Sequence, residues 1–175
     1  EDPNLPGYTR EGSEAAGGIL GWGSAERVVD MWMGSRFHRD PVFYSSCGRI
    51  AFGGRPGGCF SCKSAGGAAG KPLSDVITWP GDGDTDIPTG FGGELPDPFP
   101  KGMTSSGTLI VVEFNGRQPA KQVRRLLGPD GKEVPIVVLD KTCFVARDPL
   151  ESKTRYTVEI HGAGGYKYTW SFTTQ

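Results

Sequence analysis

Hydrophobic and polar residues alternate with period two near the C-terminal end of the chain. Tyr156, Val158 and Ile160 share one face of segment 154–160, and four aromatic residues share one face of 166–173. This alternation predicts an antiparallel pair of half-buried strands with a turn at 162–165. Further apolar runs predict strands at 108–114, 123–127, 135–139 and 142–146. Residues 75–175 are therefore expected to form an all-β sandwich.

A helical pattern occurs earlier in the chain. Ser24 is a suitable N-cap, Glu26 lies in the first turn where the helix dipole favours an acid, and Gly34 suits the end of the helix. Apolar residues between them recur at helical spacing, at positions 28, 29, 31, 32 and 33. An apolar strand is expected at 48–53, so the first part of the chain combines helix and strand.

A glycine-rich stretch, GGRPGGCFSCKSAGGAAG at 53–70, separates these two regions. Its composition predicts a flexible linker, which we place at 57–74. The polar, proline-rich passage that follows Trp79 suits the entry to a second domain. Asp82, Asp84 and Asp86 in this passage form a D-x-D-x-D pattern that indicates either calcium binding or turn chemistry, and turn chemistry fits better.

Charge and hydropathy narrow the classes of partner. The chain has 175 residues, 19 of them basic and 20 acidic, for a net charge of −1. No basic cluster is available to neutralise phosphates, which argues against a nucleic-acid partner. No apolar run reaches the roughly eighteen residues of a transmembrane helix, so we expect no transmembrane segment in this chain.

From the last turn of the helical pattern onward, Trp32, Ser35, His38 and Arg39 spell the motif W-x-x-S-x-x-H-R. With the following GRIAFG, this sequence resembles the bacterial branch of the CAP superfamily, the SCP-like extracellular domains. The resemblance implies that residues 1–56 are the C-terminal part of such a domain, a partial α-β-α unit whose first histidine would precede Glu1.

The same resemblance implies a cleft around His38. In the family an acidic residue faces this histidine, and both Glu14, eighteen positions before Trp32, and Glu11 are candidates. Ser35 or a neighbour stands where the family has a second acid. The implied cleft comprises His38, Glu14, Glu11 and Ser35. Its imidazole would accept a proton, bind a divalent metal such as zinc, or form hydrogen bonds.

The later region also resembles a known class. LESKTRY at 150–156 is similar to the tyrosine corner of fibronectin-type and bacterial immunoglobulin-like domains, and WSFTT at 170–174 is similar to the last strand of bacterial immunoglobulin-like modules. The expected fold class is α+β: a partial CAP-like α-β-α unit at 1–56 and an immunoglobulin-like β-sandwich at 75–175, joined by the linker.

Four cysteines in a chain that resembles exported proteins indicate disulfides, with three possible pairings among Cys47, Cys59, Cys62 and Cys143. Cys59 and Cys62 form a C-x-x-C unit, so a metal half-site, a redox pair and unpaired thiols stay as alternatives. A structural zinc site would need a second pair of ligands, which only Cys47, Cys143, His38 and His161 could supply, and we expect no cofactor unless His38 holds a metal.

These features favour an exported, non-enzymatic binding or structural module of the cell envelope, extracellular or periplasmic and associated with the cell surface. Its partners would be envelope proteins or a small apolar ligand. One alternative is an accessory subunit of a larger membrane-associated assembly. Another is a hydrolase or metal-dependent enzyme that uses His38 with Glu14 or Glu11, although no G-x-S-x-G or H-E-x-x-H motif accompanies them.

Overall fold

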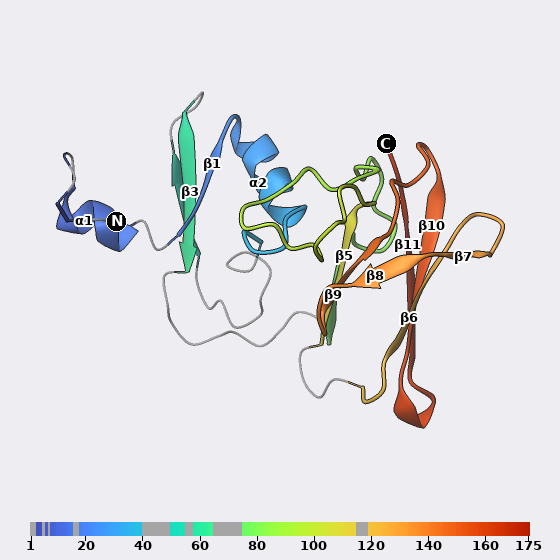
Figure 1. The fold of residues 1–175 in the computed structure, drawn as a ribbon. Coiled ribbons are helices and arrows are strands. Elements are labelled where there is room, and N and C mark those ends of the chain that lie inside the picture. The colour runs from blue at the N-terminus through green and yellow to red at the C-terminus, as the bar shows by residue number, and fades with distance from the viewer. Residues whose placement is uncertain are drawn as a thin grey trace. The chain divides into compact units, whose positions relative to one another are not determined.

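The computed structural model describes residues 3–4, 6, 8–15, 18–39, 50–54, 58–64, 75–114 and 119–175. Of these residues, 39% lie in strands and 11% in α-helices, and the strands form three sheets (Figure 1). The expected α+β class is wrong, because the described part of the chain holds no substantial CAP-like α-β-α unit. Its α-helices are short: α1 spans Arg10–Ala15 and α2 spans Ala25–Met33. Neither of these described helices is long and apolar enough to cross a membrane.

The chain divides into two compact units. The first unit comprises Glu1–Met33 and Phe37–Pro72, and the second comprises Gly34–Arg36 and Leu73–Gln175. The division at Pro72 falls inside the expected linker at 57–74. Part of that linker is a strand, however, because β3 (Cys59–Ser64) pairs with a neighbour on each side. Phe60 and Cys62 alternate with smaller or polar residues there, and this short alternation is enough to make a strand once partners are present.

The first unit is built on an antiparallel sheet with the strand order β1-β3-β2. Strand β1 spans Ile19–Trp22 and β2 spans Ile50–Gly54. Helix α2 covers one face of the sheet, where Val28 and Trp32 are buried. The buried core of this unit comprises Ile19, Val28, Trp32, Phe60 and Cys62.

The start of helix α2 and its packing against the sheet both follow from the local sequence. The Ser24 hydroxyl accepts a hydrogen bond from the Arg27 N–H at 3.3 Å, which is the predicted N-cap. Gly21 of β1 allows helix α2 to pack closely against the strand, because a Cβ at this position would lie only 2.7 Å from Cγ1 of Val28. The Trp32 indole N–H donates to the Leu20 carbonyl at 3.1 Å, so the ring is both buried and hydrogen-bonded.

The second unit contains two four-stranded antiparallel sheets (Figure 1). One has the order β4-β5-β9-β8 and the other β11-β10-β6-β7. The strand bounds are β4 Val76–Trp79, β5 Leu109–Phe114, β6 Val123–Leu127, β7 Glu133–Val134, β8 Ile136–Val138, β9 Cys143–Ala146, β10 Arg155–His161 and β11 Lys167–Thr173. The six strands predicted after residue 107 are all present, whereas β4 and β7 were not predicted.

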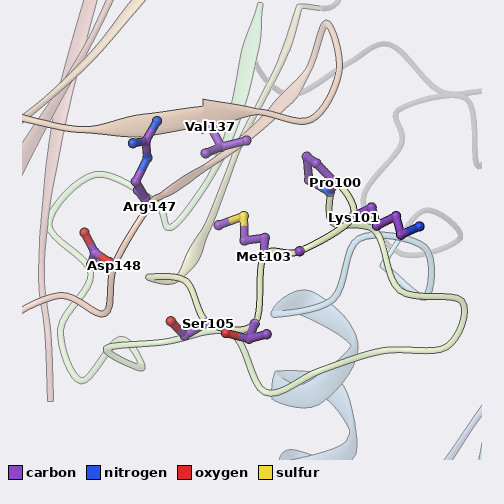
Figure 2. A pocket seen from close by; sticks show the side chains of 9 residues that line it. Pro100, Lys101, Met103, Ser105, Val137, Arg147 and Asp148 are labelled. Atoms are coloured by element: carbon purple, nitrogen blue, oxygen red, sulfur yellow. The ribbon is translucent and has the colours of Figure 1, made fainter.

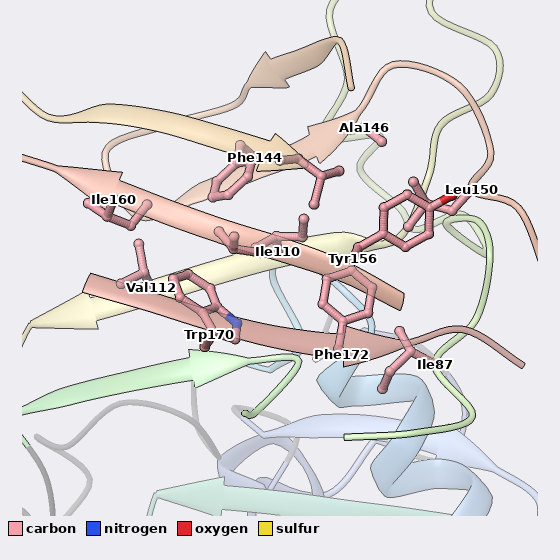
Figure 3. Close-up of a cluster of buried hydrophobic side chains, with 12 residues drawn as sticks. Ile87, Ile110, Val112, Phe144, Ala146, Leu150, Tyr156, Ile160, Trp170 and Phe172 are labelled. Carbon is pink, nitrogen blue, oxygen red and sulfur yellow. The ribbon is translucent and has the colours of Figure 1, made fainter. Parts of the chain in front are cut away.

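Side chains from both sheets meet in one core (Figure 3). Strand β10 buries alternate residues, and the aromatic face predicted for β11 lies inward at Trp170 and Phe172. Tyr166 and Tyr168 are half-buried and their rings contact Phe114 and Trp170, so they pack rather than form an exposed aromatic platform. The buried members of the core are Ile87, Ile110, Val112, Leu126, Phe144, Ala146, Leu150, Tyr156, Val158, Ile160, Trp170 and Phe172.

Polar atoms of two core aromatics are hydrogen-bonded to the backbone. The Tyr156 hydroxyl accepts a hydrogen bond from the Glu151 N–H at 2.9 Å, across the connection between β9 and β10. The Trp170 indole N–H donates to the Pro80 carbonyl at 2.9 Å. These bonds let large rings fill the core without leaving a buried polar atom unsatisfied.

The passage with three aspartates runs beside the edge of β11. Its backbone is bonded to β11 through Gly83, Asp84 and Ile87, and Asp82 accepts a hydrogen bond from the Ser171 N–H at 3.0 Å. Asp84 accepts one from the Gly81 N–H at 2.7 Å. Asp82 and Asp84 thus accept backbone hydrogen bonds, and the backbone of the passage covers a sheet edge that would otherwise be open. In the described part of the chain, no group of three or more His, Cys, Asp or Glu side chains is arranged to hold a metal ion.

The two central strands of the sheet β4-β5-β9-β8, β5 and β9, are buried on both faces, whereas β4 and β8 are only partly buried. Ile110 and Val112 of β5 face the core, and Leu109 and Val111, which point the other way, are also no more than 1% exposed. Cys143 and Val145 of β9 are buried in the same manner. Burial on both sides accounts for the continuous apolar run of β5, in contrast to the alternation of β10.

Candidate binding pocket

The residues of the implied CAP-like cleft come from two places in the chain, helix α1 and the segment after α2. Glu11 and Glu14 belong to α1, where the Glu11 side chain is exposed. His38 is half-buried in a turn after α2, and Ser35 is buried. The proximity of His38 to either glutamate, and metal binding by His38, remain predictions.

The two cysteines of the C-x-x-C unit point to opposite faces of β3. Cys62 is buried under α2, and Cys59 lies in register with Trp22 on the other face. Residues three apart in a strand have Cα atoms about 10 Å apart, too far for a disulfide or a shared metal ion. No disulfide joins any two of Cys59, Cys62 and Cys143, and Cys47 lies outside the described residues.

One polar cluster of the second unit fixes the segment Gly34–Arg36. The Arg36 guanidinium forms an ion pair with Asp140, and its backbone N–H donates to the Glu94 carboxylate at 2.6 Å. Asp140 also accepts hydrogen bonds from the N–H and hydroxyl of Thr142, at 2.7 and 2.9 Å. Burial raises the pKa of Asp140, but the bonds from Thr142 and the charge of Arg36 outweigh it and lower the pKa overall. The cluster is saturated with internal partners and has a structural role.

A second polar cluster lies on the outer face of the sheet β11-β10-β6-β7. Glu159 accepts a hydrogen bond from His161 at 2.9 Å and pairs with Lys167 and Arg125 at 3.0 and 3.3 Å. Hydrogen bonds from His161 and Lys167 lower the pKa of Glu159. These groups come from three neighbouring strands and neutralise one another, so the cluster stabilises a solvated sheet face.

A pocket of about 360 Å³ lies at the β8 end of the other sheet (Figure 2). One wall is the segment 100–105, and the opposite wall is formed by Val137 of β8 and by the residues that follow β9. Val137 and Arg147 project from the same face because Val137 is in register with Val145, two residues before Arg147. The lining residues are Pro100, Lys101, Gly102, Met103, Thr104, Ser105, Val137, Arg147 and Asp148.

The lining combines apolar surface with charge. In Figure 2 the Arg147 side chain rises beside Val137, and Met103 reaches toward them from the opposite wall. Lys101 points away from Arg147 at the far side. Val137 and Met103 supply apolar surface, and Lys101, Arg147 and Asp148 supply charges. A lining of this kind can hold a small ligand by noncovalent contacts.

The sequence did not indicate this pocket. Its residues come from three places in the chain that only the folded sandwich brings together. One signal was present: the connection between β4 and β5 spans 80–108, and loops longer than about 12–15 residues are usually functional or disordered. We interpreted that segment as a domain entry whose aspartates serve turn chemistry or, less well, calcium binding, and not as the wall of a pocket.

Comparison with models of protein families finds no match for this chain, and no curated protein matches it.

Proposed function

We propose that the second unit is an immunoglobulin-like β-sandwich and that the protein is an exported, non-enzymatic binding or structural module of the cell envelope. The main support for the immunoglobulin-like assignment is the strand order. If β4 to β11 are lettered A, B, C, C′, D, E, F and G, the sheets read A-B-E-D and G-F-C-C′. Immunoglobulin-type sandwiches have this arrangement.

The hydrogen bond of Tyr156 supports the same assignment. A tyrosine near the start of strand F, bonded to the backbone a few residues upstream, is a hallmark of these sandwiches. Tyr156 is the second residue of β10, and its hydroxyl receives the Glu151 N–H. Fold alone does not fix function, so the proposal of a binding module depends also on the pocket, whose apolar and charged lining suits a small ligand.

Cell fractionation tests where the protein acts. An antibody against the chain should detect it outside the cytoplasm, in the envelope or surface fraction of the source cells. Its partners are proposed to be envelope proteins or a small ligand with an apolar part. Recovery solely from the cytoplasm would overturn the proposed location.

A substrate panel tests whether the protein is an enzyme. Ester, peptide and glycoside reporter substrates, with and without added zinc, should show no turnover above buffer. Turnover that disappears in His38→Ala would instead support the hydrolase or metal-dependent enzyme that uses His38 with Glu14 or Glu11.

One observation favours a second candidate, an accessory subunit of a larger assembly. Leu20 and Trp22 lie on the face of β1 opposite to α2, and they are 42% and 69% exposed. Size-exclusion chromatography with light scattering tests this candidate. It predicts association that Trp22→Gln reduces, whereas a soluble monomer at high concentration would contradict it.

A further inference from the structure

We propose that the pocket between segment 100–105 and β8 binds a carboxylate attached to a short apolar group, with Arg147 as the carboxylate-binding residue. This inference deepens the proposed function by naming the class of ligand. It depends on the pocket and on the charges around it, and not on where the protein is located.

Backbone hydrogen bonds hold the pocket in place. The Gly107 N–H donates to the Ala146 carbonyl at 3.0 Å, and this bond ties the end of the long segment to β9. The Arg147 N–H donates to the Pro135 carbonyl at 2.9 Å, and the Met103 N–H donates to the Pro100 carbonyl at 3.1 Å. The β8 wall and the end of the long segment are therefore held in place without a ligand, and segment 100–105 has an internal turn, which lowers the cost of ordering the site on binding.

Arg147 differs from the other described arginines of the second unit. Arg36 pairs with Asp140, Arg125 pairs with Glu133 and Glu159, and Arg155 donates to the Ser171 hydroxyl. Arg124 donates to the Lys141 carbonyl and the Gln122 side chain. For the Arg147 guanidinium, by contrast, no ion pair or side-chain hydrogen bond to a described residue exists.

The residues around Arg147 indicate which chemical class of ligand the pocket suits. A guanidinium offers paired N–H donors that match the two oxygens of a carboxylate. Val137 and Met103 give an apolar surface next to it, so the ligand should carry a hydrophobic group beside its carboxylate. Lys101 adds a second positive charge at the far side, against the single negative charge of Asp148. The pocket has a volume of about 360 Å³, is open to solvent, and has exposed charged residues at Lys101, Arg147 and Asp148, which suits a small group that is only partly enclosed.

Such a carboxylate has two sources, a free acid or the C-terminus of a peptide. The second is feasible because β8 is an edge strand of its sheet. Pro135 and Leu139 direct their backbone groups toward β9, so those of Ile136 and Val138 point to the open edge. An extended peptide would pair with this edge while its last side chain and carboxylate enter the pocket.

NMR titration of the full chain tests the proposal with defined probes. Hexanoate is compared with hexanamide, and an acetylated tetrapeptide ending in free leucine with its C-terminal amide. We expect each acid to bind at least tenfold more tightly than its amide, and to shift the Met103 and Val137 methyl signals. If the peptide acid binds tenfold more tightly than hexanoate, a peptide C-terminus is the source, and comparable affinities indicate a free acid.

Variants locate the site. Arg147→Gln should weaken binding of the acids at least tenfold, whereas Lys132→Gln, which removes an exposed lysine outside the pocket, should leave binding within twofold. Met103→Glu places a carboxylate inside the pocket and should abolish binding of acids. Failure of both acids to bind at millimolar concentration, or equal binding by Arg147→Gln, would overturn the proposal. Either failure is independent of the fractionation result, which tests only the proposed location.

Discussion

The two units each contain a strand with apolar residues on both faces, but the strands differ in what covers them. In β1 of the first unit, Ile19 is buried whereas Leu20 and Trp22 are largely exposed. In β5 of the second unit, four consecutive apolar residues from Leu109 to Val112 are all buried. An apolar strand therefore does not by itself indicate a sheet that is covered on both sides. We infer that the second unit is the more stable one.

The largest expected effect is in the core shared by the two sheets of the second unit. Phe144→Ala removes a fully buried ring and should lower the free energy of unfolding of this unit by about 3–5 kcal/mol. Phe52→Ala is the matched change in the first unit. Its ring is half exposed, so the loss should be only about 1–2 kcal/mol. Urea unfolding measures both losses of unfolding free energy, and equal losses would contradict the inferred difference in stability between the two units.

A more specific test compares a residue on the outer face of the second unit, Val145 of β9, with one on the open face of the first unit, Leu20 of β1. Val145 is fully buried on the face of β9 that points away from the core, and Val145→Ala should cost about 2 kcal/mol of unfolding free energy. Leu20→Ala on the open face of β1 should cost less than about 1 kcal/mol, although it removes more atoms. Urea unfolding should rank the two variants in this order. The reverse order would mean that the outer face of the second unit is not covered.

The hydrogen bond between Tyr156 and Glu151 should contribute less than core packing. Tyr156→Phe keeps the ring and removes the hydroxyl, so the free energy of unfolding should fall by about 1 kcal/mol. Tyr168→Phe, at a half-buried ring of the neighbouring strand, is the control and should change the stability by less than about 0.5 kcal/mol. If both variants match the wild type, the Tyr156 bond does not stabilise the sandwich.

The smallest expected effect concerns the pH dependence of Asp140. Its pKa in the folded chain is below the ordinary value of 3.8, so its contribution to stability is present above about pH 4 and is lost as the pH falls through the folded pKa. Asp140→Asn should therefore be less stable than the wild type at pH 7, by under about 1 kcal/mol, and the difference should shrink below pH 4. Arg36→Gln should reduce the same pH dependence. A difference that stays constant from pH 7 to pH 3 would contradict the assignment.

Strong periodicity made the strands of the second unit predictable. In β10 and β11 the residues that face the core alternate strictly, and both strands lie within one residue of the predicted bounds at each end. The helix from Ala25 to Met33 also follows from its own cap and apolar face. In these segments, local sequence and tertiary packing favour the same structure.

Other features depend on partners that are distant in the sequence. Strand β3 has glycines before it and after it in the sequence, and it becomes a strand because β1 and β2 pair with it. The α-β-α unit was inferred from a resemblance based on a short motif and its flanking sequence, but the described part of the chain has only helices of six and nine residues and no substantial unit of this kind. The pocket was not predictable, since Met103, Val137 and Arg147 meet only after the two sheets have formed.

Native-state hydrogen exchange of the full chain tests most directly whether the two sheets of the second unit share one cooperative core. We predict that the amides of Val111 in β5 and Val158 in β10 exchange with the same, highest opening free energy, because neither sheet can lose its partner without exposing the core. The amides of Phe60 and Cys62 in β3 should exchange with a lower opening free energy. If Val111 and Val158 open with clearly different free energies, or if β3 is the most protected strand, the account is contradicted.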